Sequence, residues 1–174
     1  MVGIRKREET LSRTRLHRRR RWRREKKLTT ADIMEDARIS ASESGQSFTK
    51  IRRHVLSTLL QTEKALTAYE ILDRLEGVGA SAPPTAYRAL DFLVDLGYVK
   101  RVESLNAYTA LKQGPTDEPI GLFICKTCQA VREIDFPETD NMIDNLMKSQ
   151  SFDSDSLLLE VHGRCKSETE CVMA

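Results

Sequence analysis

The sequence predicts an α+β protein in which a helical N-terminal unit precedes a small α/β unit. Three segments between residues 48 and 96 repeat their apolar residues at helical spacing, and two short alternating runs follow at residues 98–111. After a polar break at residues 112–119, strand-like runs flank one more helical segment. This order predicts two small domains, at residues 48–112 and 113–174, behind an N-terminal extension.

The extension, residues 1–47, begins with a basic arm. Residues 1–27 carry 13 Lys and Arg against 3 Asp and Glu, a net charge of +10, whereas residues 28–174 have a net charge of −8. Such arms bind nucleic acid by neutralising phosphates and are usually disordered alone. A solvated tail, an extension from a non-native start codon and a mitochondrial presequence are also compatible with this composition, and Glu8, Glu9 and Glu25 argue against the last. Residues 28–47 lack sustained periodicity, so we expect a short helix at most and then a linker.

The first two helical segments have clear apolar faces. The face of residues 48–61 consists of Ile51, Val55, Leu56, Leu59 and Leu60. Residues 67–77 open with Thr67 and Glu70 at the spacing of a capping box and end on Gly77, a residue favoured just after a helix. We expect two helices that pack their apolar faces together.

The third helical segment, residues 83–96, starts with two prolines and carries Tyr87 and Arg88 on its first exposed turn. A hairpin with its turn near residues 104–106 follows, and three helices followed by a hairpin is the order of a winged helix-turn-helix. In that architecture the third helix enters the DNA major groove, where Arg88 would reach guanine or a phosphate and Tyr87 a phosphate or a thymine methyl group. Exposed Tyr–Arg pairs also occur on helices that bind no DNA.

The second unit, residues 113–174, has two strand-like runs around a turn at residues 120–136, a helical segment at 138–150 and a strand-like run at 154–163. Residues 116–174 have a net charge of −7, which excludes a second DNA-binding surface and favours dimerisation or ligand sensing.

All four cysteines fall in this unit as two pairs. Cys125 and Cys128 form a C-x-x-C in the turn, and Cys165 and Cys171 form a C-x5-C near the end of the chain. Four thiolates suit tetrahedral zinc, although the second spacing is wider than usual. A redox pair is disfavoured because strands and not a helix flank the first pair, while a disulfide bond or inert thiols would also be compatible with the spacing. Four thiolates leave no open coordination position, so this zinc would be structural.

Several stretches resemble the ferric-uptake-regulator family, most closely its zinc-responsive branch, over about residues 48–171: AYEILDRL, PPTAYRALDFLVDLGYVKRVESLNAY, LFICKTCQAVRE and EVHGRC. The resemblance implies a homodimer with a winged-helix domain and a small α/β dimerisation domain, which binds palindromic operator DNA in a metal-dependent way and usually represses uptake genes. It makes Tyr87 and Arg88 the DNA-contacting pair and the four cysteines the structural zinc ligands. Thr85 and the wing residue Arg101 complete our candidate DNA contacts.

The resemblance also implies a regulatory zinc site at the hinge, and here the sequence departs from the family. The family's four ligands fall at Lys100, Leu111, Glu118 and Glu133, of which only the two carboxylates suit a metal. The histidines are too few and too scattered to share a hinge ion: His17, His54 and His162. Glu118 and Glu133 are therefore candidates for a residual sensor site. We also hypothesise that the charge of Lys100, beside one of them, imitates the ion.

These patterns favour a cytoplasmic transcription regulator with structural zinc and an altered or absent metal switch. No apolar run approaches the roughly 18 residues that a membrane span requires, and no secretory signal opens the chain. An enzyme or a small-molecule substrate is not indicated, because there is no nucleophile–base pair, phosphate loop or open metal site. The competing hypothesis is a winged-helix module that contacts other proteins and binds no specific DNA.

Overall fold

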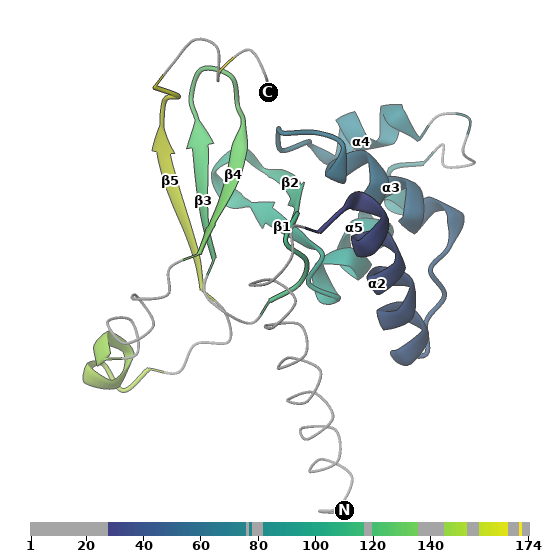
Figure 1. Ribbon diagram of the computed structural model, residues 1–174, viewed down its shortest axis with the longest axis horizontal. Helices are drawn as coiled ribbons and strands as arrows, with labels where there is room; N and C mark the ends of the chain where they lie inside the picture. The colour runs from purple at the N-terminus through teal and green to yellow at the C-terminus, as the bar shows by residue number, and fades with distance from the viewer. Residues whose placement is uncertain are drawn as a thin grey trace, which may run out of the picture.

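The computed structural model describes residues 28–75, 77, 82–116, 120–135, 145–152, 157–166 and 171. Its elements, in chain order, are α2 (Thr30–Glu43), α3 (Lys50–Leu60), α4 (Ala68–Arg74), α5 (Pro83–Asp95), β1 (Val99–Val102), the short 3₁₀ helix η1 (Glu103–Leu105), β2 (Ala107–Ala110), β3 (Ile120–Cys125), β4 (Val131–Asp135) and β5 (Leu158–Gly163). The helices lie on one side, a three-stranded sheet on the other, and the β1–β2 hairpin between them (Figure 1). The predicted α+β fold, a winged helix followed by a small α/β domain, is confirmed.

Some sequence predictions fall partly or wholly outside the described residues. The basic arm, residues 1–27, is one of them. Of the helix expected at residues 138–150, only residues 145–150 are described, and residues 145–149 are helical. No helix among the described residues is long and apolar enough to cross a lipid bilayer.

Helix α2, with 14 residues, is longer than the short helix followed by a linker that was expected at residues 28–47. Thr29 and Asp32 form a capping box at its start, which satisfies backbone N–H groups that the first helical turn leaves unpaired. Ile33, Ala37 and Ala41 follow at one-turn intervals and are buried against the helical core. The expectation of at most a short helix is therefore wrong for residues 30–43, and α2 packs as part of the helical core.

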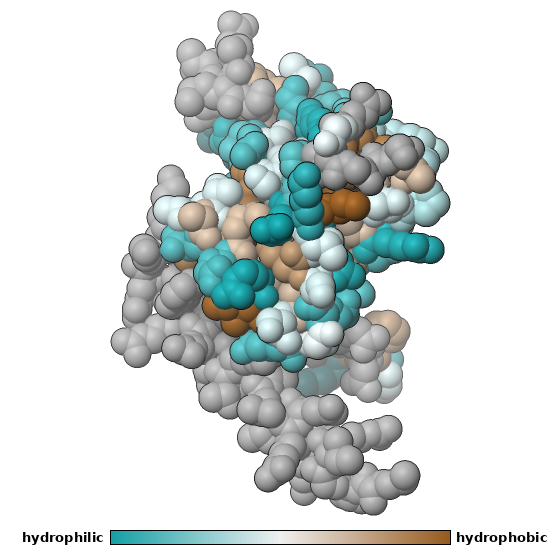
Figure 2. All heavy atoms as spheres, turned by 90° about the vertical axis from the view of Figure 1, so that its right-hand side faces the viewer, coloured by the Kyte–Doolittle hydropathy of each residue, from teal (hydrophilic) through white to brown (hydrophobic). Residues whose placement is uncertain are grey.

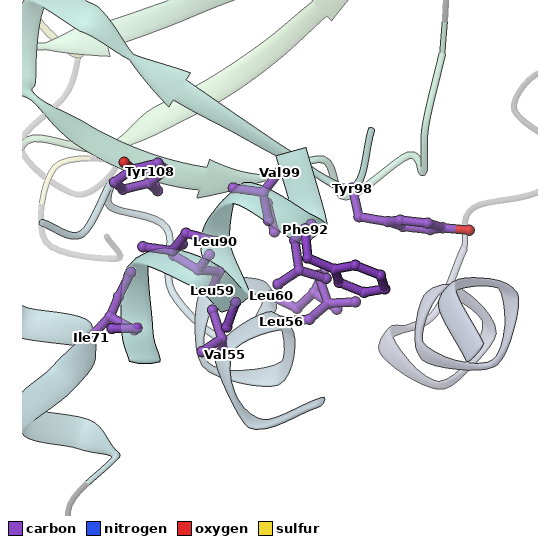
Figure 3. Close-up of a cluster of buried hydrophobic side chains, with 14 of the residues drawn as sticks. Val55, Leu56, Leu59, Leu60, Ile71, Leu90, Phe92, Tyr98, Val99 and Tyr108 are labelled. Carbon is purple, nitrogen blue, oxygen red and sulfur yellow. The ribbon is translucent and has the colours of Figure 1, made fainter. Parts of the chain in front are cut away.

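Helices α3, α4 and α5 form the predicted winged-helix core. Thr49 and Thr67 cap α3 and α4, and the two prolines occupy the first turn of α5, where their missing N–H groups cost nothing. The apolar faces of the three helices meet with β1 and β2 in one cluster, drawn in Figure 3, that includes Val55, Leu56, Leu59, Leu60, Ile71, Leu90, Phe92, Val99 and Tyr108. The core fixes which face of α5 remains outside.

Tyr98 ties α2 to the base of the wing. Its ring is fully buried, and its hydroxyl is directed toward α2 (Figure 3). The hydroxyl donates to Asp36 Oδ2 at 2.5 Å and lies 2.8 Å from the Ser40 hydroxyl. Because buried polar groups must be paired, this contact anchors α2 as part of the domain.

The second domain is a three-stranded sheet in the order β4-β3-β5, with β4 antiparallel and β5 parallel to β3. The parallel register pairs Cys125, the last residue of β3, with Gly163, the last residue of β5. The carboxyl ends of these two strands therefore meet at one edge of the sheet, and both cysteine pairs begin there.

Candidate functional site

The metal centre is built by the register of β3 and β5. Cys125 ends β3 and Cys128 follows in the turn, where Gln129 adopts a left-handed conformation with φ of 62°. Lys126 N donates to Gly163 O at 2.9 Å, which ties this turn to the end of β5, and Cys165 comes two residues later. The fourth cysteine, Cys171, returns to the same place although six positions separate it from Cys165.

The geometry of the four sulfurs fits a tetrahedral ion. All four Sγ atoms lie within 4.8 Å of one another. The Cys125–Cys171 and Cys128–Cys165 Sγ–Sγ distances are 3.9 and 3.8 Å, too long for a disulfide. Four sulfurs at the Zn–S distance of about 2.3 Å lie about 3.8 Å apart in a tetrahedron, and the two distances above match this value.

The electrostatics of the cluster favour a thiolate at Cys125. Backbone N–H groups of Cys128, Cys165 and Thr127 point toward its sulfur and lower its pKa to about 5. Hydrogen bonds with the side chains of Cys171 and Cys125 instead raise the pKa of Cys165 to about 12, because they favour its protonated form, and repulsion from the charge on Cys125 adds to the shift. A divalent cation would remove this repulsion by replacing the remaining thiol protons.

The candidate nucleic-acid interface is the outward face of α5. Ala86, Ala89 and Leu90 of this helix are buried, which turns the intervening Tyr87 and Arg88 outward. Tyr87 is 40% exposed, Arg88 is exposed, and Thr85 is half-buried one turn earlier. Among the described residues, Arg88 has no ion-pair partner within 4 Å. The pair is thus presented to solvent at the start of the helix, as predicted.

The wing residue Arg101 is placed differently from the helix residues. Its guanidinium donates to Asn106 Oδ1 at 2.9 Å and pairs with Glu103 at 3.3 Å, so it is held within the hairpin. Both partners are exposed, and exposed ion pairs contribute little stability, so a phosphate could replace Glu103. The hairpin therefore holds Arg101 near its own turn.

Tyr69 is an exposed aromatic residue that the sequence analysis missed. It lies in the first turn of α4, which packs against α5, and it is 65% exposed. It falls outside the apolar periodicity of residues 67–77, and this departure from the pattern is the sequence signal for an exposed aromatic residue.

The face of the molecule drawn in Figure 2 is largely hydrophilic, with its apolar residues in separate small groups.

Comparison with known proteins places the chain in a family. The model of the ferric uptake regulator family matches residues 43–162. The chain belongs to the ferric uptake regulator family. The zinc uptake regulation protein of Escherichia coli (strain K12) is 33% identical over 147 residues, which are 83% of this chain and 85% of that protein.

Two solved members of the family are similar to this chain over most of its length. A zinc uptake regulator complexed with zinc and DNA is 32% identical, with a TM-score of 0.73, and the match covers 85% of this chain and 100% of that one. Holo XcZur is 32% identical with a TM-score of 0.69, over 84% of this chain and 100% of that one. The family is one of regulators and not of enzymes, in agreement with the sequence analysis.

Among the described residues, the three described positions of the expected regulatory site, Lys100, Leu111 and Glu133, do not form a metal cluster. Leu111 is fully buried in an apolar cluster, and Lys100 is half-buried in β1. Glu133 Oε1 accepts a hydrogen bond from the backbone N–H of Lys112, and Glu118 lies outside the described residues. Within the described part of the chain, the four cysteines are the one group of three or more potential ligands that lie close together.

The hypothesis that the charge of Lys100 lies beside Glu133 finds no support in the contacts, and its alternative partner, Glu118, lies outside the described residues. Among the described residues, no ion pair joins Lys100 to Glu133. The lysine that contacts this part of the molecule is Lys112, whose ammonium lies 2.5 Å from Glu63 Oε1. The role of Lys112 was not predictable from short-range patterns, because its partner Glu63 is 49 positions away.

Proposed function

We propose that the chain is a homodimeric transcriptional regulator that binds operator DNA, acts in the cytoplasm and represses metal-homeostasis genes. In this proposal the four cysteines hold a structural zinc ion and the regulatory metal site is altered or absent. One observation carries the DNA-binding part. Tyr87 and Arg88 are exposed on α5 of a chain that is 32% identical, over 85% of its length, to a zinc uptake regulator solved with zinc and DNA.

The helix α5 would read the DNA. Arg88 has the length and the planar donor array to contact guanine O6 and N7 in the major groove, and Tyr87 would contact a phosphate or a thymine methyl group. The Thr85 hydroxyl, at the start of the helix, would donate to the DNA backbone. The Arg101 guanidinium would bind a DNA phosphate in place of the Glu103 carboxylate. Tyr69 on the neighbouring α4 is a further candidate contact.

The zinc ion would hold the second domain together. Cys125 and Cys128 belong to the β3–β4 turn, and Cys165 and Cys171 to the segment after β5, so one ion would tie all three strands at a single edge. When bound, zinc would supply four metal–thiolate bonds and no open position for chemistry. This domain would dimerise through its sheet, where Phe123 is 46% exposed on β3 and Leu159 is 44% exposed on the edge strand β5.

The proposal is tested by DNA selection with the purified full chain. Duplexes enriched from a random-sequence pool serve as the probe, and affinity is measured for wild type, Arg88→Ala and Arg38→Ala. Arg38 is the matched control, because it is an exposed helical arginine on α2 that pairs with Glu35 at 2.7 Å. We expect Arg88→Ala to lose about tenfold to a hundredfold in affinity, the value of a good base contact of about 1–3 kcal/mol. Arg38→Ala should bind normally.

Two results would contradict the proposal. If wild type enriches no duplex, the protein-contact module becomes the better interpretation. If Arg88→Ala binds the selected duplex as tightly as Arg38→Ala, α5 is not the reading helix. Elemental mass spectrometry of the same sample should give one zinc per chain that resists a mild chelator, and a chain that purifies without zinc would remove the structural zinc from the proposal.

A further inference from the structure

An apolar seam joins the winged helix to the sheet of the second domain. Val102, at the end of β1, and Leu111, just after β2, are fully buried. They pack with residues of β3 and β4 in a cluster separate from the helical core: Ile120, Leu122, Ile124 and Val131. The seam thus fills the joint between the domains with side chains that have no donor atom for a metal.

A closed ring of polar contacts lies beside the seam. The carbonyl of Glu63, in the loop between α3 and α4, accepts from Val131 N of β4 at 2.7 Å. Two residues further along β4, the Glu133 carboxylate accepts from the backbone N–H of Lys112. The ring closes where the Lys112 ammonium pairs with the Glu63 carboxylate at 2.5 Å. Lys112 therefore connects the end of the wing both to β4 and to the loop that contacts β4.

The same loop also bridges the two sheets through its backbone. Leu66 exchanges backbone hydrogen bonds of 2.9 and 2.8 Å with Tyr108 of β2. Lys64 forms an antiparallel bridge with Ala130, the residue before β4. A short extended segment of the helical domain thus lies between the wing and the second sheet and pairs with both.

The tip of the wing is held by a second carboxylate. Glu160 of β5 accepts from the backbone N–H groups of Glu103 at 2.8 Å and of Ser104 at 3.3 Å. Its side chain is only 15% exposed. Burial raises the pKa of Glu160, but the Ser104 hydroxyl and these two N–H groups lower it by more, and the net shift is downward. The carboxylate is therefore ionised at neutral pH, and hydrogen bonds to a charged acceptor are stronger than neutral ones.

We propose that Glu63, Lys112, Glu133 and Glu160, which we call the interdomain clasp, hold the two domains in one arrangement without a metal ion at the joint. The consequence of the clasp is that DNA binding does not respond to free zinc once the cysteine site holds its ion. This consequence, unlike the clasp itself, rests on the proposed function. The clasp engages the wing at both ends, with Glu160 at the tip and Lys112 at the exit from β2. Rotation of one domain against the other would break both contacts and open the apolar seam.

Amide hydrogen exchange tests the clasp itself. The full chain, carrying one zinc, is compared before and after addition of excess zinc, and the readout is exchange in the segments 102–106 and 111–113. In the wild-type chain we expect slow amide exchange in both segments, with the same rate before and after zinc is added. Glu160→Ala should speed exchange at Glu103 and Ser104 by about tenfold or more, and Glu133→Ala should do so at Lys112. Glu35→Ala, which removes an exposed carboxylate on α2, is the control and should change neither segment.

The opposite pattern would overturn the clasp. Fast exchange in both segments of the one-zinc protein, slowed by uptake of a second ion, would mean that a metal and not the clasp closes the joint. If amide exchange in Glu160→Ala is the same as in wild type, Glu160 is not part of the clasp. Glu160→Gln, which keeps one acceptor oxygen and the side-chain volume, should give an intermediate rate and guards against misfolding of the alanine variant.

A DNA measurement separates the clasp from the proposed function. With a duplex selected by wild type, affinity should stay within about twofold when excess zinc is added, and Glu160→Ala should bind about tenfold more weakly. Normal affinity in Glu160→Ala, or tighter wild-type binding on uptake of a second zinc ion, would overturn the claimed consequence. If no duplex is selected, the proposed function fails, whereas the exchange experiment still decides whether the clasp exists.

Discussion

At the scale of single residues, the metal centre depends on whether the chain brings Cys171 back to the other three cysteines. Cys125, Cys128 and Cys165 are brought together by hydrogen-bonded strands and a turn, so their positions follow from the sheet. Among the described residues, Cys171 itself belongs to no strand, and its sulfur lies 3.9 Å from that of Cys125. A bound ion would thus be the main force that keeps this last residue at the cluster.

Substitution of single cysteines should show whether Cys171 is a zinc ligand like the other three. We expect Cys171→Ser to purify with zinc that a mild chelator removes, and to lose roughly 3 kcal/mol or more of stability, the scale of losing a structural metal. Cys128→Ser should behave in the same way. The measurements are zinc per chain by elemental mass spectrometry and urea unfolding. If Cys171→Ser keeps its zinc as firmly as wild type while Cys128→Ser does not, the fourth ligand is a different group.

The cysteine cluster and the joint between the domains differ in how far the sequence predicts them. Two short cysteine spacings within one small domain indicate a shared ion before any fold is known. The contacts of Lys112 with Glu63 and of Glu160 with the wing tip join residues about 50 positions apart. Such contacts follow from the tertiary arrangement, and any of the many acidic residues could have been the partner.

At the scale of elements, the junction between α5 and β1 determines how this helix is connected to the hairpin. The helix ends with Gly97 in a left-handed conformation, φ of 77°, and Tyr98 N donates back to Leu93 O at 3.0 Å. A Cβ atom at Gly97 would lie 3.2 Å from Pro115 Cβ in the segment that leads to the second domain. Glycine is therefore needed here both for the backbone and for the close approach.

Gly97 and Gly45 form a matched pair that separates these two effects. Gly45 has a similar φ of 70°, but a Cβ atom there would meet nothing within 4 Å. We expect Gly45→Ala to cost about 1 kcal/mol, the penalty of a left-handed conformation, and Gly97→Ala to cost about 1 kcal/mol more. Urea unfolding of the two variants measures the difference. Equal losses of stability in the two variants would mean that the segment around Pro115 moves aside at no cost in free energy.

The N-terminal cap of α4 should make part of the stability depend on pH. Hydrogen bonds from the backbone N–H and hydroxyl of Thr67 lower the pKa of Glu70 below its usual value of 4.5. A lowered pKa in the folded state adds stability above the unfolded pKa, and this stability is lost as the pH falls through the folded pKa. Glu70→Ala should therefore be up to about 1 kcal/mol less stable than wild type at pH 7.

The difference between wild type and Glu70→Ala should shrink at pH 4, measured by urea unfolding at both pH values. Zinc release at acid pH affects both proteins and cancels in the comparison. A difference that is the same at pH 4 and pH 7 would show that the carboxylate does not act through its charge.

The elements themselves were predictable where apolar residues are large and regularly spaced. Helices α3 and α5 have Leu, Ile, Val and Phe at helical intervals, and both were predicted. Helix α2 buries Ile33 together with Ala37, Ser40 and Ala41, whose small side chains give almost no hydropathy signal. The capping pair of Thr29 and Asp32 was the signal present in the sequence, and it marks the true start of the domain.

At the scale of the whole molecule, charge is separated along the chain in an unusual way for a DNA-binding protein. Residues 28–115, which contain the winged helix, carry 10 Lys and Arg and 11 Asp and Glu, and residues 116–174 have a net charge of −7. The winged helix is thus nearly neutral, and its partner domain is acidic. Only residues 1–27, with a net charge of +10, offer the phosphates a strongly positive segment.

Deletion of residues 1–27 should therefore weaken DNA binding mainly through its electrostatic part. Each phosphate that the arm neutralises contributes about 0.9 to the slope of log affinity against log salt, so the slope should fall by several units in the shortened chain. The preference for the selected duplex over a random one should persist, because Tyr87 and Arg88 remain. Titration of both proteins with the same duplex at several salt concentrations gives the two slopes. Equal slopes would show that the arm does not contact DNA, and a lost preference would mean that the arm, and not α5, reads the sequence.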